Sequence, residues 1–123
     1  MAEVIARQLE KRHGGGVEFS SAGTHAVIGS GATAQAVAVV GELGMALRWH
    51  RARQLTDQIV TAADKLVALD HQHVEFIEMH YPAAPVELLD SVPDPYGLDV
   101  GSYRAVRDQI AVAIGERAGR WLG

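Results

Sequence analysis

A continuous apolar run between two helical segments constrains the fold of this chain more than any other feature. The run is Lys65-Leu66-Val67-Ala68-Leu69, and it lacks the polar alternation of a strand with one face in water. Asp70 closes the run, residues 71–80 have helical spacing, and residues 86–89 predict a further strand. Strands that alternate with helices form parallel sheets through crossover connections. The pattern therefore predicts an α/β fold with a small parallel sheet and helices on both faces.

The clearest helical periodicity lies at the C-terminal end, after a loop over Asp90–Leu98. One side of this helix carries Tyr103, Val106, Ile110, Ile114, Arg117 and Trp121. The remaining segments predict helices over 2–13, 32–43 and 57–63 and a strand over 17–21. The first of these helices is expected to stop at Gly14-Gly15-Gly16, and the second to bury Ala36, Val40 and Leu43.

Length and composition indicate one domain over residues 1–123, large enough to bury a core without metals or crosslinks. A net charge of −4 argues against nucleic acid or an anionic membrane as partner, because both surfaces are negative. No stretch is long and apolar enough for a membrane span, and no segment resembles a signal peptide. We therefore expect a cytoplasmic protein, with no cofactor. The chain contains no cysteine.

Four short motifs occur along the chain in a fixed order. They are Ser20-Ser21-Ala22-Gly23-Thr24, His50-Arg51-Ala52-Arg53-Gln54-Leu55, Asp70-His71-Gln72-His73 and Asp94-Pro95-Tyr96-Gly97. Together they resemble the low molecular weight protein tyrosine phosphatases. The resemblance implies a three-layer α/β sandwich with a small parallel sheet. It departs at the start, because family members open with a buried strand and a Cys-x5-Arg loop, and here the chain begins at the helix that follows, Met1-Ala2-Glu3.

In that family a cysteine thiolate attacks phosphorus, and no residue of this chain can supply it. The resemblance therefore implies a phosphatase-like protein without phosphatase activity in this chain. Two alternatives remain open. The cleft could serve a different acid–base reaction through Asp94, assisted by Tyr96, His25 or His50. Alternatively, the natural protein starts upstream, and this chain is a truncated form of an active tyrosine phosphatase.

Asp94 is the candidate general acid and base. An Asp-Pro-Tyr turn holds a carboxyl group on a loop, although Asp-Pro is also a common turn starter. The resemblance gives the matching aspartate the role of protonating the leaving oxygen. It also places Tyr96 at the mouth of a phosphotyrosine slot, where the alternative is a half-buried tyrosine in a turn.

A small basic cluster surrounds the second motif and includes Arg48, His50, Arg51 and Arg53. Guanidinium groups suit a phosphate or carboxylate, so His50 and Arg53 are candidate binding residues for a small or phosphorylated ligand. The alternative is a solvated face. We expect no metal site, because the two-residue spacing of His71 and His73 sends their side chains to different faces of a helix. Asp70 instead caps that helix.

The family's first strand lies between the segments matching 17–21 and 65–69. Without it, two rows of backbone groups would lose their partners, at about 1–3 kcal/mol for each buried group. The neighbouring strands could close up and pair directly, a second copy could contribute a segment, or the sheets of two copies could join at their exposed edges. We therefore predict a homodimer.

Overall fold

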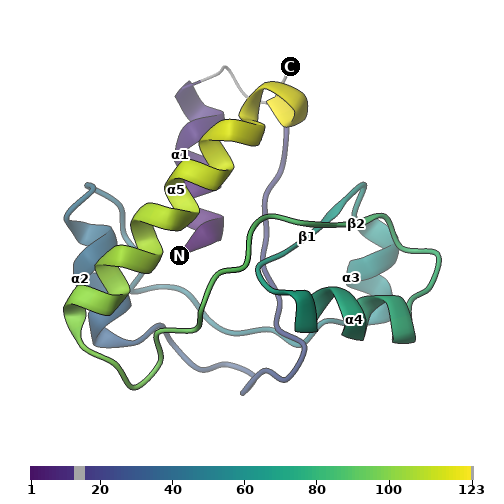
Figure 1. Ribbon diagram of the computed structural model, residues 1–123, viewed down its shortest axis with the longest axis horizontal. Coiled ribbons are helices and arrows are strands. Elements are labelled where there is room, and N and C mark those ends of the chain that lie inside the picture. The colour runs from purple at the N-terminus through teal and green to yellow at the C-terminus, as the bar shows by residue number, and fades with distance from the viewer. Residues whose placement is uncertain (13–15, 123) are drawn as a thin grey trace.

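The computed structural model describes residues 1–12 and 16–122, and its elements fall into two groups (Figure 1). The helical group consists of α1 (Ala2–Arg12), α2 (Ala34–Gly41) and α5 (Val100–Leu122). The sheet group consists of α3 (Asp57–Ala62), β1 (Leu66–Ala68), α4 (His71–His80) and β2 (Val86–Leu88). An extended segment after Gly16 runs between the two groups. The Gly14-Gly15 part of the predicted helix stop lies outside the described residues.

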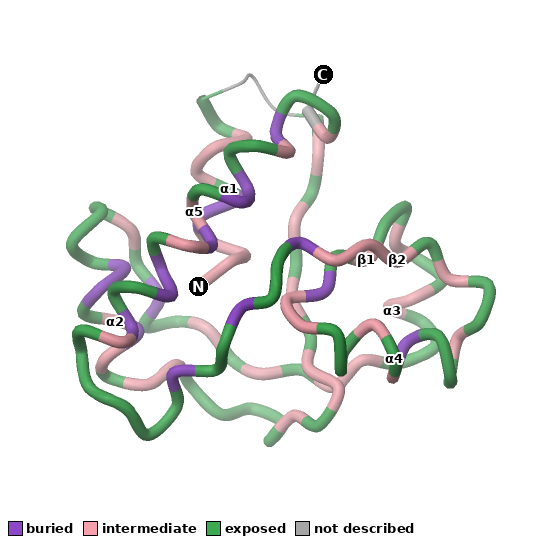
Figure 2. Tube along the Cα trace, in the orientation of Figure 1, coloured by how far each residue is buried: buried purple, intermediate pink, exposed green. Residues whose placement is uncertain are grey.

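Helix α5 is the centre of the helical group, because α1 and α2 both pack against it. The predicted stripe is confirmed at Tyr103, Val106, Ile110 and Ile114, which are all buried. Arg117 and Trp121 continue the stripe as half-buried residues that bond the sheet group. Arg117 donates to the Leu88 carbonyl, and Trp121 Nε1 donates to Glu87. Figure 2 shows that most buried positions follow these three helices.

Local side-chain chemistry fixes the starts of three helices. Thr33, Thr56 and Asp70 each accept a hydrogen bond from a backbone N–H in the first turn of the helix that follows. Such caps satisfy donors that have no partner within the helix. The predicted capping role of Asp70 is confirmed, since its Oδ1 lies 3.0 Å from the Gln72 nitrogen.

The sheet is parallel, as predicted, and consists of β1 and β2 among the described residues. Helix α4 connects the two strands and packs against both. Leu66 pairs with Val86 and Ala68 with Leu88. The α/β class and the small parallel sheet are therefore confirmed.

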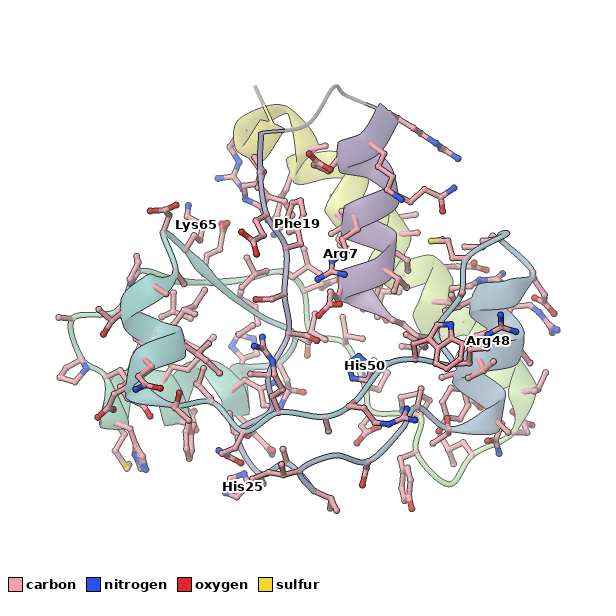
Figure 3. The ribbon with its side chains drawn as sticks, turned by 180° about the vertical axis from the view of Figure 1, so that it is seen from behind. Arg7, Phe19, His25, Arg48, His50 and Lys65 are labelled. Atoms are coloured by element: carbon pink, nitrogen blue, oxygen red, sulfur yellow. The ribbon has the colours of Figure 1, made fainter. Side chains whose placement is uncertain are left out.

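The predicted strand over 17–21 does not form. These residues are extended but carry no ladder, and a single parallel bridge, Gly23 to Gln54, lies beyond them. Side chains bond these residues where a neighbouring strand would: Arg7 of α1 donates through Nε to the Phe19 carbonyl at 3.0 Å (Figure 3). Arg53 donates to the Ser21 carbonyl. A strand needs a partner along its edge, and here no described strand lies in hydrogen-bonding range.

Two further burial predictions differ from the structure. The run at 65–69 is not covered on both faces, because Val67 is 38% exposed and β1 pairs with β2 alone among the described strands. Leu43 lies beyond the end of α2 and is 40% exposed, whereas Ala36 and Val40 are buried as expected. Helical spacing predicts which residues share the buried side of a helix only as far as the helix extends.

None of the described helices combines the length and apolar character that crossing a membrane requires.

Candidate functional site

The candidate acid Asp94 lies on the loop between β2 and α5. Its side chain is exposed, and its Oδ1 accepts a hydrogen bond from the Tyr96 backbone nitrogen at 3.0 Å. This contact within the Asp-Pro-Tyr turn fixes the carboxylate relative to its own backbone. Asp94 is therefore held on an exposed turn, with one oxygen occupied by the loop itself.

Two other aspartates anchor this loop at its ends. The Gln109 side chain and the Ser91 backbone N–H bond Asp90 and hold its pKa below the usual range. At the other end, the backbone and hydroxyl of Ser102 lower the pKa of Asp99. Hydrogen bonds to the charged form of a carboxyl group favour that form. Both anchors therefore stay ionised near neutral pH, and the loop is tied to α5 on either side of Asp94.

An open hollow of about 260 Å³ lies between the loop and α5. Its lining residues are Pro93, Asp94, Pro95, Leu98, Ser102, Ala105, Val106 and Gln109. Tyr96 is not among them, and its side chain is 75% exposed. The alternative of a half-buried tyrosine is therefore wrong for this structure, because the ring projects into solvent. The hollow is mainly apolar, with Asp94 as its ionisable group.

The Arg53 side chain forms hydrogen bonds within the fold. Its Nε and Nη2 both donate to the Ser21 carbonyl, at 3.2 and 3.1 Å, while its own carbonyl accepts from the Gly23 nitrogen at 2.8 Å. The guanidinium is thus directed at backbone, although it stays at the surface. A ligand anion at Arg53 would have to share its donors with Ser21.

The histidines named from the sequence lie in different settings. His50 is half-buried on the segment before Arg53, and its backbone nitrogen bonds the Leu47 carbonyl at 3.1 Å. His25 is exposed, and its ring lies edge-on to Phe76 of α4 with centroids 5.3 Å apart. Among the described residues, no hydrogen bond or ion pair joins Asp94 to His25, His50 or Arg53. The structure brings Asp94 and Tyr96 together on one loop and His50 and Arg53 together on another.

Gln54 is a site residue that sequence reasoning missed. Its Oε1 accepts from the Ala26 nitrogen at 2.9 Å, and its Nε2 donates to the Thr24 carbonyl at 2.7 Å. The side chain thereby holds the turn after Gly23 against the segment that carries His50 and Arg53. Its place inside the second motif, directly after Arg53, was the available signal. Within residues 1–12 and 16–122, no group of three His, Asp or Glu side chains is arranged to hold a metal ion.

Comparison with known proteins identifies the family. The family model described as "Low molecular weight phosphotyrosine protein phosphatase" matches residues 1–118. The chain belongs to this family. The relationship that the sequence motifs predicted is therefore confirmed.

Similar proteins include enzymes named for two different phosphorylated residues. The protein-arginine-phosphatase of Geobacillus stearothermophilus is 30% identical over 121 residues, which cover 90% of this chain and 81% of that protein. A crystal structure of a YwlE mutant from Bacillus subtilis matches with a TM-score of 0.91 and 28% identity, over 97% of this chain and 86% of that one. The low molecular weight protein tyrosine phosphatase from T. tengcongensis matches with a TM-score of 0.92 and 26% identity, over 97% and 88% of the two chains.

Proposed function

We propose that this chain is a phosphatase-family protein that binds a phosphorylated or other small ligand without hydrolysing phosphate esters. The observation that carries the proposal is the absence of cysteine from all 123 residues. A thiolate is the nucleophile that the resemblance implies, and a hydroxyl or carboxylate does not replace it without an activating partner. A general acid such as Asp94 contributes roughly 10²–10⁴ in rate, which does not compensate for a lost nucleophile.

The site geometry supports binding more than turnover. Asp94 Oδ1 is occupied by the Tyr96 N–H, and among the described residues no hydrogen bond or ion pair joins Asp94 to His50 or Arg53. Arg53 is at the surface, where a ligand can share its donors with the Ser21 carbonyl. The exposed Tyr96 ring remains available for stacking on an aromatic or planar ligand. We place the ligand at Tyr96, His50 and Arg53 and assign Asp94 no catalytic step in phosphate ester cleavage.

Two phosphatase assays test the loss of activity. The chain is incubated with an aryl phosphate and, separately, with a phosphoarginine peptide, because related proteins carry names for both chemistries. We expect release of phosphate at the rate of the buffer alone for both compounds. Turnover that disappears in Asp94→Asn would show that the chain hydrolyses phosphate esters and would refute the proposal.

Calorimetric titration with phenyl phosphate tests the binding role. We expect Tyr96→Ala to weaken binding by about two- to tenfold, the range that an aromatic contact contributes. Met79→Ala is the control, because Met79 is a 78% exposed apolar residue on α4 and does not line the hollow. Equal affinities for the original chain and both variants would remove Tyr96 from the site.

A second candidate function is an acid–base reaction at the hollow that Asp94 lines. The mainly apolar walls favour this function, because they can hold the apolar part of a small substrate beside the Asp94 carboxylate. Under this alternative, Asp94→Asn abolishes turnover of a substrate without phosphorus while the melting temperature stays nearly unchanged.

The remaining alternative is a truncated form of an active phosphatase. It predicts a chain that melts at low temperature without cooperativity, whereas a protein adapted to this length unfolds in one cooperative transition.

We also propose that the protein is cytoplasmic and forms a homodimer through the open edge of β1. The dimer is supported by Val67, an apolar residue in the middle of β1 that is 38% exposed. A monomeric mass in light scattering would count against the dimer.

A further inference from the structure

Arg48, Trp49 and Arg51 form an exposed surface beside the second sequence motif, which we call the Trp49 surface. The guanidinium carbon of Arg48 lies 5.3 Å from the centroid of the Trp49 ring, and Trp49 is 75% exposed. Figure 3 shows Arg48 beside α2, separate from His25. A guanidinium over an indole face is an attractive arrangement that orders both side chains. The surface therefore presents an ordered aromatic ring and a cation together.

The Trp49 surface lies in a positively charged part of an acidic protein. Residues 19–56 contain three arginines and one acidic residue, Glu42, in a chain with a net charge of −4. Glu42 is engaged elsewhere, because Arg104 and Arg107 of α5 both bond its carboxylate. Within residues 1–12 and 16–122, the two exposed cations Arg48 and Arg51 thus form no ion pair.

Arg51 is held in place by backbone contacts. Its Nη1 donates to the carbonyls of Arg48 and His50, at 3.3 and 2.7 Å, and a Cβ added at Gly31 would lie only 3.3 Å from this atom. The small residue at Gly31 therefore leaves room for the arginine. The other guanidinium nitrogens of Arg51 remain available to a ligand.

An apolar turn lies beside the Arg51 end of the Trp49 surface. The Ser30 nitrogen bonds the Val27 carbonyl at 3.1 Å, and the Gly29 nitrogen bonds the Ala52 carbonyl at 2.9 Å, which fixes the turn next to Arg51. Val27 and Ile28 are 74% and 75% exposed. Exposed apolar residues that are held by backbone bonds, and that lie beside cations, are typical of a contact site for another protein.

We propose that the Trp49 surface docks an acidic peptide segment of another protein, one that carries an aromatic or aliphatic side chain among its carboxylates. Arg48 and Arg51 would receive the carboxylates, and Trp49 with the apolar turn would receive the apolar side chain. The charge of the surface is complementary to such a segment. A symmetric contact between two copies would instead bring these arginines against each other.

Fluorescence anisotropy of a short labelled peptide tests the proposal. The peptide contains several glutamates around one phenylalanine, and a matched peptide carries glutamine in place of every glutamate. We expect saturable binding of the glutamate peptide and at least about tenfold weaker binding of the glutamine peptide. Raising NaCl from about 0.1 to about 1 M shortens the Debye length from about 10 to about 3 Å and should weaken binding further.

Variants locate the contact. Arg48→Glu and Trp49→Ala should each weaken binding by about tenfold, a loss expected of residues that anchor an interface. Arg12→Glu and Met79→Ala are the matched controls, because both residues are exposed and lie on other elements, α1 and α4. We expect the controls to bind as the original chain does, with all variants showing the original melting temperature.

Four outcomes would overturn the proposal. Equal binding of both peptides would remove the charge argument, and full binding by Arg48→Glu and Trp49→Ala would place the contact elsewhere. Competition by inorganic phosphate beyond that of sodium chloride at the same ionic strength would make the surface an anion site. Loss of self-association in Trp49→Ala, seen by light scattering, would assign the surface to a second copy.

Discussion

The helical group and the sheet group differ in how much apolar surface each of them buries. The helical group contains the fully enclosed Val39 and Val40 and a row of buried side chains along α5, whereas the elements of the sheet group bury Ala68 and Ile77 among the described hydrophobic residues. Because burial of apolar surface is the main stabilising term, the two groups contribute unequally to stability. The sheet group should therefore open at lower free energy than the helices.

The largest expected effect concerns the two buried isoleucines, one in each group. Ile110→Ala should lower the free energy of unfolding by about 3 kcal/mol, because Ile110 is 2% exposed in the main core. Ile77→Ala should cost less, since α4 has few buried neighbours. Urea unfolding measures both, with the 61% exposed Val112→Ala as the control within about 0.5 kcal/mol. Equal losses for Ile110 and Ile77 would mean that the two groups share one core.

An intermediate effect is expected at Arg107, a buried charge inside the helical group. Its Nη1 donates to the Val39 carbonyl at 2.9 Å and to Glu42 at 2.6 Å, and Asp108 bonds the same guanidinium. Arg107→Met should cost about 2 kcal/mol, because a buried carbonyl loses its donor. Arg104→Met is the matched control, since it removes a surface pair to the same Glu42 and should cost less than about 1 kcal/mol. Equal losses of unfolding free energy in Arg107→Met and Arg104→Met would show that the burial of Arg107 makes no difference to its contribution.

The smallest expected effect is a pH dependence at Glu42. Hydrogen bonds from Arg104 and Arg107 lower the pKa of Glu42 from 4.5 to about 2. Between these two pKa values the unfolded chain binds more protons at Glu42 than the folded chain does. The contribution of ionised Glu42 to the free energy of unfolding is therefore fully present above pH 4.5 and is lost as the pH falls toward 2. Glu42→Gln should therefore flatten the fall in melting temperature over this range. Exposed Glu116→Gln serves as control, and an unchanged profile in Glu42→Gln would exclude the effect.

Local patterns predicted the helical elements well. The stripe on α5 follows from spacing alone, and Asp70 at the start of α4 follows from capping chemistry. The parallel unit of β1, α4 and β2 follows from an apolar run on each side of a helical segment. Each of these signals is contained within a short stretch of sequence.

Features that depend on distant partners were not predictable in the same way. Residues 17–21 have the composition of a strand, but a strand exists only where another one lies beside it. Arg53 has the chemistry of a ligand-binding residue, yet its guanidinium is directed at a carbonyl 32 positions earlier in the chain. The sequence motifs located the loop of Asp94 and Tyr96, but whether these residues bind a ligand stays a prediction. Arg107 was not singled out from the sequence, although it lies four residues after Tyr103 and three before Ile110, on the buried side of α5.

Arginine side chains bond the extended segment at the Phe19 and Ser21 carbonyls, one from α1 and the other from the segment before α3. Bonds in a ladder between strands are released in order from an end. A guanidinium on a flexible stem can instead swing away by rotating its own torsions, while the backbone on either side keeps its shape. The two arginine hydrogen bonds to this segment can thus break one at a time. An incoming strand could bond each freed carbonyl in turn while the surrounding structure stays folded.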